Sequence, residues 1–192
     1  MRPIFSLLSA WLLCIALAAC DSKPTFNNVD ITGAPYGKDF ALTDHTGTPR
    51  TLADFKGKVV VLFFGYTHCP DVCPTDMAEW AAALQKLGAD AARVQVLFVT
   101  FDPERDTPAL LARYVPSFNP TFLGLYGDLA TTQKTAKDFN VYYEKVPGKT
   151  PQDYTMNHSA GSYVFDPTGQ LRLFVRHGQG IDALAHDLRE LL

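Results

Sequence analysis

Two closely spaced cysteines, Cys69 and Cys73, are the residues of this chain best suited to do chemistry. A cysteine at the N-terminus of a helix feels the positive end of the helix dipole and unpaired N–H groups, which favour the thiolate. A spacing of four residues on a first helical turn would bring both sulfurs to the same side. Such a pair can form a disulfide, exchange thiols, or capture a soft metal such as Cu(I). These residues alone leave a copper site, a redox pair and an inert disulfide open.

The other two cysteines belong to an apolar N-terminal segment. Residues 4–19 are almost entirely apolar, follow Arg2, and end in small residues directly before Cys20. The run is too short for a comfortable membrane span and is typical of a signal peptide. Because the tetrapeptide LAAC at residues 17–20 resembles a bacterial lipobox, we expect residues 1–19 to be removed and Cys20 to be lipidated. Two acyl chains would anchor the protein stably on the extracytoplasmic side, on the periplasmic face of the inner membrane.

The rest of the chain has the composition of one globular domain. Residues 20–36 are polar with proline and glycine, which predicts a flexible tether after the lipid, and residues 37–192 would form the domain. Loss of the signal peptide changes the formal charge from −3 to −4, because residues 1–19 contain Arg2 and no acid. With no cluster of lysine and arginine, nucleic acid is not expected as a partner. Within the domain, a disulfide across so short a loop would remove little unfolded-state entropy, so a redox or metal role is favoured for the cysteine pair.

The hydrophobic pattern predicts strands and helices in alternation. Predicted strands span residues 40–43, 50–52, 59–64, 94–101, 121–126, 141–146, 161–165 and 171–175, and predicted helices span residues 77–87, 107–114, 129–139 and 181–191. Alternation of this kind indicates βαβ units, and the terminal hairpin and helix add an antiparallel edge. The expected class is α/β with a thioredoxin-like fold: a central mixed sheet flanked by helices, with an N-terminal hairpin.

A histidine stands where thioredoxin-like redox proteins generally carry a cis-proline beside their cysteines. The segment YTMNHSAG, residues 154–161, contains no proline and offers His158 instead. The preceding segment, from Val146 onward, carries two prolines and a glycine and could let this loop move when a metal enters or leaves. His68 adjoins Cys69, but adjacent side chains diverge at a strand end, so we expect it to support the site at most. The remaining histidines, His45, His177 and His186, are expected to be solvated.

Three motifs together resemble the Sco/SenC family: YTHCPDVCPTDM at residues 66–77, FDPERDTP at residues 101–108, and NHS at residues 157–159. The resemblance extends from about Phe40 to the C-terminus. It implies a copper chaperone for cytochrome c oxidase assembly that binds Cu(I) or Cu(II) through Cys69, Cys73 and His158. The implied partner is the copper-receiving subunit of the oxidase, and an extracytoplasmic dithiol would also need a periplasmic thiol reductant.

Details of these motifs give further expectations. Family members often carry aspartate before the ligand histidine; Asn157 lacks that charge, which should affect affinity but not the identity of the ligand. In the second motif we expect Asp102 to pair with Arg105 and Asp106 to cap the helix that Pro108 begins. A docking surface for the partner is the functional alternative for this motif.

Other functions remain possible for the dithiol. It could act as an enzyme, a thiol-disulfide reductase that keeps cysteines of the oxidase subunit reduced, or as a copper or redox sensor. A peroxidase of the peroxiredoxin type is disfavoured, because Leu62 and Tyr66 stand where those enzymes carry proline and threonine.

Overall fold

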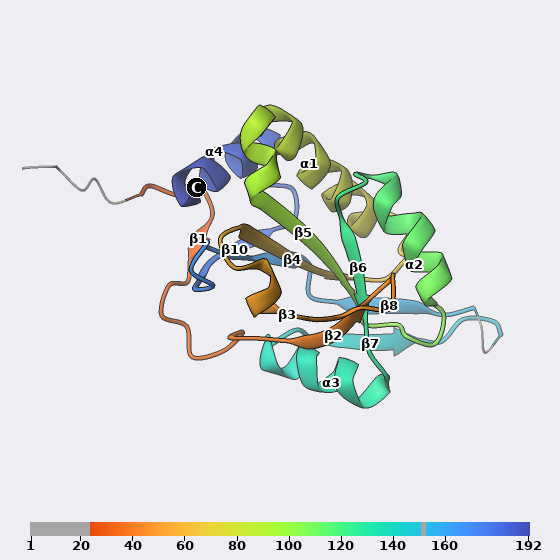
Figure 1. Ribbon diagram of the computed structural model, residues 1–192. Helices are drawn as coiled ribbons and strands as arrows, with labels where there is room; N and C mark the ends of the chain where they lie inside the picture. The colour runs from red at the N-terminus through yellow and green to blue at the C-terminus, as the bar shows by residue number, and fades with distance from the viewer. Residues whose placement is uncertain (1–23, 151–152) are drawn as a thin grey trace, which may run out of the picture.

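A mixed sheet of eight strands forms the centre of the protein, in a computed structural model that describes residues 24–150 and 153–192 (Figure 1). The strand order is β1-β10-β9-β4-β5-β6-β2-β3. These strands are β1 (Val29–Asp30), β2 (Ala41–Asp44), β3 (Pro49–Thr51), β4 (Val59–Gly65), β5 (Val94–Thr100), β6 (Leu123–Tyr126), β9 (Gly161–Phe165) and β10 (Leu171–Arg176). A separate antiparallel pair consists of β7 (Tyr143–Val146) and β8 (Thr155–His158).

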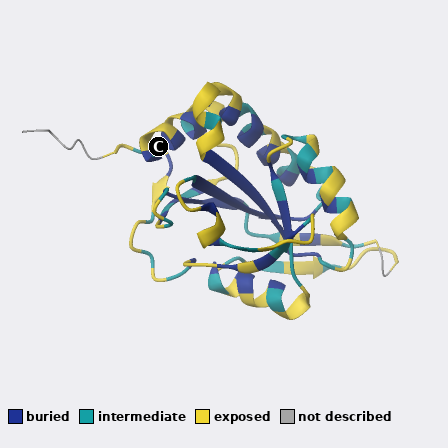
Figure 2. Ribbon diagram, viewed as in Figure 1, coloured by how far each residue is buried: buried dark blue, intermediate teal, exposed yellow. Residues whose placement is uncertain are grey.

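Helices cover both faces of the central sheet. They are α1 (Val72–Leu87), α2 (Pro108–Tyr114), α3 (Leu129–Asp138) and α4 (Ile181–Leu191), with 3-10 turns at η2 (Leu52–Phe55), η3 (Gly88–Arg93) and η4 (Val115–Ser117). Helices α1 and α4 pack together on one face, and α3 lies on the opposite face (Figure 1). Every residue of β4 and β5 is therefore buried, as Figure 2 shows for the middle of the sheet. Such double burial explains why these two strands are continuous apolar runs instead of alternating ones.

The observed topology confirms the predicted fold class. Strand β4 runs parallel to β5 and antiparallel to β9, so the sheet is mixed. The N-terminal hairpin is β2–β3, in which Ala41 pairs with Thr51, and the terminal hairpin is β9–β10. On α1 the predicted apolar positions Met77, Trp80 and Leu84 are all buried. The periodicity of that segment thus identified the face that packs on the sheet.

The N-terminal part of the domain differs from the predicted tether. Strand β1 extends the central sheet by pairing with β10, with Val29 opposite Phe174. The backbone N–H groups of Asn27 and Asn28 donate to the Asp187 carboxylate of α4 at 2.8 and 2.9 Å. Residues 24–36 thus belong to the domain, because polar contacts with α4 and the pairing of β1 hold the segment, and apolar side chains such as Phe26 and Tyr36 pack against the core.

The predictions for the first residues remain predictions. The signal peptide, Cys20 and the start of the tether lie outside the described residues. Within residues 24–150 and 153–192, no helix is both long and apolar enough to cross a membrane.

Candidate metal centre

Cys69 lies in the loop between β4 and α1, and Cys73 lies in the first turn of α1, so the two are not on one helical turn as predicted. Helix α1 begins at Val72, so Cys73 is its second residue and Cys69 precedes it. The Cys73 N–H group instead points to Cys69 Sγ at 3.4 Å. A Cβ atom at Gly65, the last residue of β4, would lie 3.0 Å from Cys73 Sγ and closer still to the Phe63 ring. Glycine at the strand end therefore makes room for the buried sulfur.

His158 reaches the cysteines from the end of β8. Its Nε2 atom lies 3.8 Å from Cys73 Sγ. Among the described residues, the one group of three or more histidines, cysteines and acids with ligand atoms close enough to hold a metal ion is Cys69, Cys73 and His158, whose atoms lie within 4.8 Å of one another. The structure thus brings together the three residues that the family resemblance implied, from segments 85 positions apart.

The imidazole of His158 is oriented by the main chain. Its Nδ1 atom lies 3.0 Å from the Ser159 carbonyl oxygen, and because a carbonyl can only accept, Nδ1 carries the proton. The lone pair of neutral imidazole then belongs to Nε2, which faces the sulfurs. The ring also packs against Phe101, with centroids 4.8 Å apart. The group that orients His158 is thus the Ser159 carbonyl instead of the side chain at position 157.

The two thiols have opposite acidities. A hydrogen bond from the Cys73 thiol lowers the pKa of Cys69 to about 3, assisted by a hydrogen bond with His158 and by the N–H groups of Asp71 and Cys73, while burial opposes the shift. The hydrogen bond to Cys69 and burial raise the pKa of Cys73. At neutral pH the pair therefore holds one proton, with the thiolate on Cys69. Both are free cysteines, Cys69 half-buried and Cys73 buried.

A groove gives access to the more exposed sulfur. It has a volume of about 380 Å³ and lies between the segment 69–72 and β8, with Tyr66 and Ala160 also in its lining. Cys69 and His158 contribute to its wall, whereas Cys73 does not. A reactant can therefore approach Cys69 and His158 from solvent, while Cys73 is reached only from within the site.

The other histidines lie outside this cluster. His68 is turned toward Thr67 Oγ1 and Asp106, with Nδ1 distances of 3.1 and 3.6 Å. His45 was predicted to be solvated, which is wrong: it is half-buried, and its Nδ1 accepts the Gly124 N–H at 3.0 Å because the β2–β3 hairpin packs beside β6. His177 and His186 are exposed, and each contacts an aspartate.

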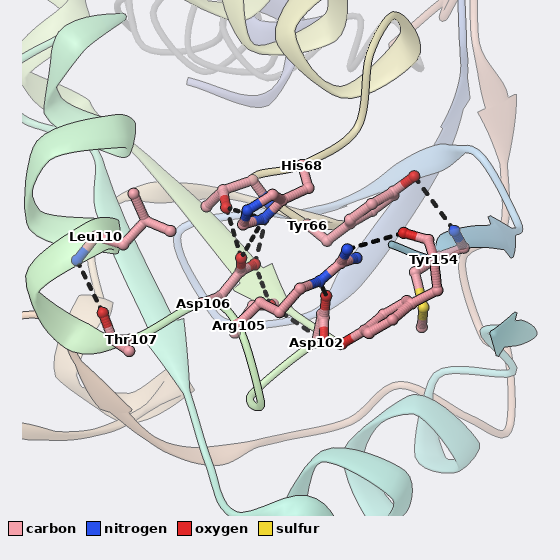
Figure 3. A network of polar contacts seen from close by, with 11 residues as sticks. Tyr66, His68, Asp102, Arg105, Asp106, Thr107, Leu110 and Tyr154 are labelled. Carbon is pink, nitrogen blue, oxygen red and sulfur yellow. Dashed lines mark hydrogen bonds and ion pairs between the residues drawn. The ribbon is translucent and has the colours of Figure 1, made fainter. Parts of the chain in front are cut away.

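The FDPERDTP motif contacts both parts of the metal centre, since Phe101 packs against His158 and Asp106 accepts hydrogen bonds from Thr67, two residues before Cys69. Figure 3 shows the polar contacts of this motif. The predicted pair is confirmed, since Arg105 Nε lies 2.6 Å from the Asp102 carboxylate. The predicted cap is wrong: Thr107 caps α2 by accepting the Leu110 N–H, while Asp106 points inward and accepts the Thr67 hydroxyl at 2.5 Å. An inward aspartate is stable here because Thr67 and Thr100 supply hydroxyl donors.

Two tyrosines near the site were missed by the sequence reasoning. Tyr66 accepts the Met156 N–H at 3.3 Å, and Tyr154 donates its hydroxyl to Asp102 at 2.6 Å. Tyrosine at these positions carries no local signal, because the partners lie 90 and 52 residues away.

The fold and the site define a thioredoxin-like protein with a dithiol and a histidine gathered beside its central sheet. The family model SCO1/SenC matches residues 29–192, and the chain belongs to this family. The mouse protein SCO2 homolog, mitochondrial, is 39% identical over 153 residues, which are 79% of this chain and 60% of that protein. The chain thus spans about 60% of the length of this relative.

Solved structures of related proteins agree with this assignment. Bradyrhizobium japonicum ScoI with copper bound is 43% identical, with a TM-score of 0.73, over 82% of this chain and 99% of that one. Apo Sco1 from Thermus thermophilus is 39% identical, with a TM-score of 0.78, over 89% of this chain and 99% of that one.

Proposed function

We propose that this protein binds one copper ion through Cys69 Sγ, Cys73 Sγ and His158 Nε2, and delivers it to the copper centre of cytochrome c oxidase. The observation that carries the proposal is the convergence of these three atoms within 4.8 Å. Thiolate sulfur is a soft ligand that suits Cu(I), and imidazole suits several copper states. The copper-bound structure of the Bradyrhizobium japonicum relative supports copper as the cargo.

The arrangement suits release as well as binding. Three protein ligands leave coordination positions open for groups of a recipient. Cys69 and His158 line the groove, so a recipient's ligand can approach the ion beside them, while buried Cys73 is the last contact to break. Because the ligands must be deprotonated, copper uptake displaces the proton that the dithiol holds.

The test is titration of the reduced protein with Cu(I) against a chromophoric chelator, followed by metal analysis. One copper per chain is expected, with weaker binding in Cys69→Ser, Cys73→Ser and His158→Ala. His186→Ala is the matched control, because this exposed histidine contacts Asp187 and does not belong to the Cys69, Cys73 and His158 cluster. Retention of tight, stoichiometric binding in His158→Ala would exclude His158 as the third ligand.

The second candidate function is thiol-disulfide reduction of the same target. The low pKa of Cys69 favours it, since a half-buried thiolate beside a second thiol can attack a disulfide. The two functions separate in a strain that lacks the gene. His158→Ala keeps the dithiol. If the protein acts as a reductase, this variant should restore oxidase activity at limiting copper; if it acts as a copper carrier, the variant should not. A periplasmic thiol reductant is required in both cases to keep Cys69 and Cys73 reduced.

The proposed location is the extracytoplasmic face of a bacterial membrane, with Cys20 as the lipidated residue. The support is the LAAC tetrapeptide at residues 17–20. Cys20→Ala should block acylation and processing, and fractionation of cells with acyl-chain labelling would detect the change. Normal processing and membrane attachment of Cys20→Ala would contradict the lipid anchor.

A further inference from the structure

The β7–β8 hairpin that carries His158 is not part of the central sheet. In the part of the chain that the structure describes, β8 pairs with β7 alone. Its position relative to the cysteines therefore depends on side-chain contacts and on its direct connection to β9. This dependence makes the contacts around the hairpin decisive for the distance between His158 and Cys73.

One group of contacts ties the hairpin to the FDPERDTP motif (Figure 3). The Tyr154 hydroxyl donates to the fully buried Asp102 carboxylate at 2.6 Å, and Arg105 Nη1 donates to the Tyr154 carbonyl oxygen at 2.8 Å. The Arg105 guanidinium also lies over the Tyr154 ring, 3.5 Å from its centroid. Arg105 and Asp102 are themselves joined at 2.6 Å. Tyr154 is thus held at its hydroxyl, its ring and its backbone, four residues before His158.

The same motif also contacts the loop that carries Cys69, through its second acid, Asp106. Asp106 accepts both the N–H and the hydroxyl of Thr67, two residues before Cys69, at 3.0 and 2.5 Å. The Asp106 N–H in turn donates to the Asp102 backbone oxygen at 2.9 Å. Two acids of one short loop therefore contact the two separate halves of the metal centre.

The geometry points to Asp102, Arg105 and Tyr154 as positioning residues that hold His158 at the cysteine pair without touching the metal. This inference rests on the proposed copper function of the same site. Removal of the Tyr154–Asp102 hydrogen bond should therefore lower the affinity for copper only by displacing His158. Cys69 and Cys73 should keep their positions.

The variant Tyr154→Phe removes one hydroxyl and keeps the ring under Arg105. Loss of a group hydrogen-bonded to a metal ligand costs about 10- to 100-fold in metal affinity; because Tyr154 acts on His158 through the backbone, we expect a loss at the lower end, about 10-fold, for Cu(I). Tyr163→Phe is the matched control, since it also removes a tyrosine hydroxyl that donates to a buried acceptor, the Phe139 carbonyl oxygen, away from the metal centre. Copper affinity should be unchanged in that control.

A double-mutant cycle with His158→Ala gives the decisive readout. In the His158→Ala background, Tyr154→Phe should have no further effect on Cu(I) affinity, because the ligand that it positions is gone. An equal loss in both backgrounds would overturn the inference and show a general structural role. Unchanged affinity of Tyr154→Phe in the wild-type background would overturn it as well. Arg105→Lys, which keeps the charge but loses the planar fork, should behave as Tyr154→Phe does.

A measurement on the metal-free protein separates this inference from the proposed function. The rings of His158 and Phe101 are in contact, and nuclear Overhauser effects between them report the position of His158. Tyr154→Phe should lose these effects, and Tyr163→Phe should keep them. Wild-type effects in Tyr154→Phe would overturn the positioning role whether or not copper binds, whereas failure of the wild-type protein to bind copper would overturn only the proposed function.

Discussion

The two cysteines of the metal centre differ in their surroundings although they are four residues apart. Cys69 lies before α1 in a groove and receives hydrogen bonds, whereas Cys73 is buried within the first turn. The sequence predicted thiolate character for the pair from its place at a helix start, but not this asymmetry. Which sulfur is exposed depends on the exact residue at which the helix begins, and helix ends are poorly fixed by local pattern.

This asymmetry predicts which thiol reacts. Because the pKa of Cys69 is lowered to about 3, its thiolate persists far below the usual range of a thiol, and iodoacetamide should modify Cys69 first. The rate should be nearly constant between pH 5 and pH 8, whereas an ordinary thiol would slow about tenfold per unit. Peptide mass spectrometry after brief alkylation at each pH measures how much of Cys69 and of Cys73 is modified. Cys73→Ala removes the thiol that donates the main hydrogen bond to Cys69, so the alkylation rate of Cys69 should again depend steeply on pH. Preferential modification of Cys73 in the wild-type protein would contradict the assignment of the thiolate to Cys69.

At the scale of elements, local pattern predicts some strands and misses others for a physical reason. Strand β4 and helix α1 are long and strongly patterned, so their type and the end of α1 at Leu87 were predicted correctly, although α1 begins at Val72, five residues before the predicted start. Strand β8 was missed, since its four residues have mixed character and their pairing with β7 is set by contacts distant in sequence. Tyr154 was missed for the same reason, although His158 and the Asp102–Arg105 pair were found through the motifs.

The N-terminal hairpin β2–β3 offers an element-scale prediction. Burial raises the pKa of Asp44, but hydrogen bonds from Thr46, Arg50 and Thr48 outweigh it and lower the value from 3.8 to about 2. A lowered pKa in the folded state stabilises the protein above pH 3.8, and that contribution is lost as the pH falls from there toward 2. Asp44→Asn should therefore lower the free energy of unfolding by about 2 kcal/mol at pH 7 and by progressively less below pH 4.

Urea denaturation of both proteins across this pH range checks the hairpin prediction. Asp90→Asn, at an exposed acid of η3, is the control and should change stability little. A difference between wild type and Asp44→Asn that stayed constant down to pH 2 would show that the carboxylate charge is not responsible.

At the scale of the whole molecule, the domain begins earlier than its composition suggested. The segment at residues 24–36 resembles a linker in sequence. Asn27 and Asn28 nevertheless donate hydrogen bonds to the Asp187 carboxylate, and β1 pairs with the edge of β10. Such contacts are not visible in local pattern, because they depend on an acid about 160 residues away. The overall mixed sheet, in contrast, follows from the order of its strongly patterned strands and was predicted.

The early boundary predicts the effect of truncation. A chain that starts at residue 37 should unfold with a free energy lower by at least about 3 kcal/mol than one that starts at residue 24, because Asp187 loses its amide donors. Chemical denaturation of the two chains measures the difference. Asp187→Asn should cost stability in the longer chain but have little effect in the shorter one. Equal stability of the two chains would restore the tether interpretation for the whole segment.

The proposed copper site holds the ion by the two sulfurs of Cys69 and Cys73 and by the His158 nitrogen. X-ray absorption at the copper edge, on the reduced protein loaded with one equivalent of Cu(I), measures the ligand atoms directly. We expect two sulfur scatterers and one imidazole nitrogen in the wild-type protein, with the imidazole signal absent from His158→Ala and retained in His186→Ala. An imidazole signal that persists in His158→Ala, or a spectrum with fewer than two sulfurs in the wild-type protein, would contradict it.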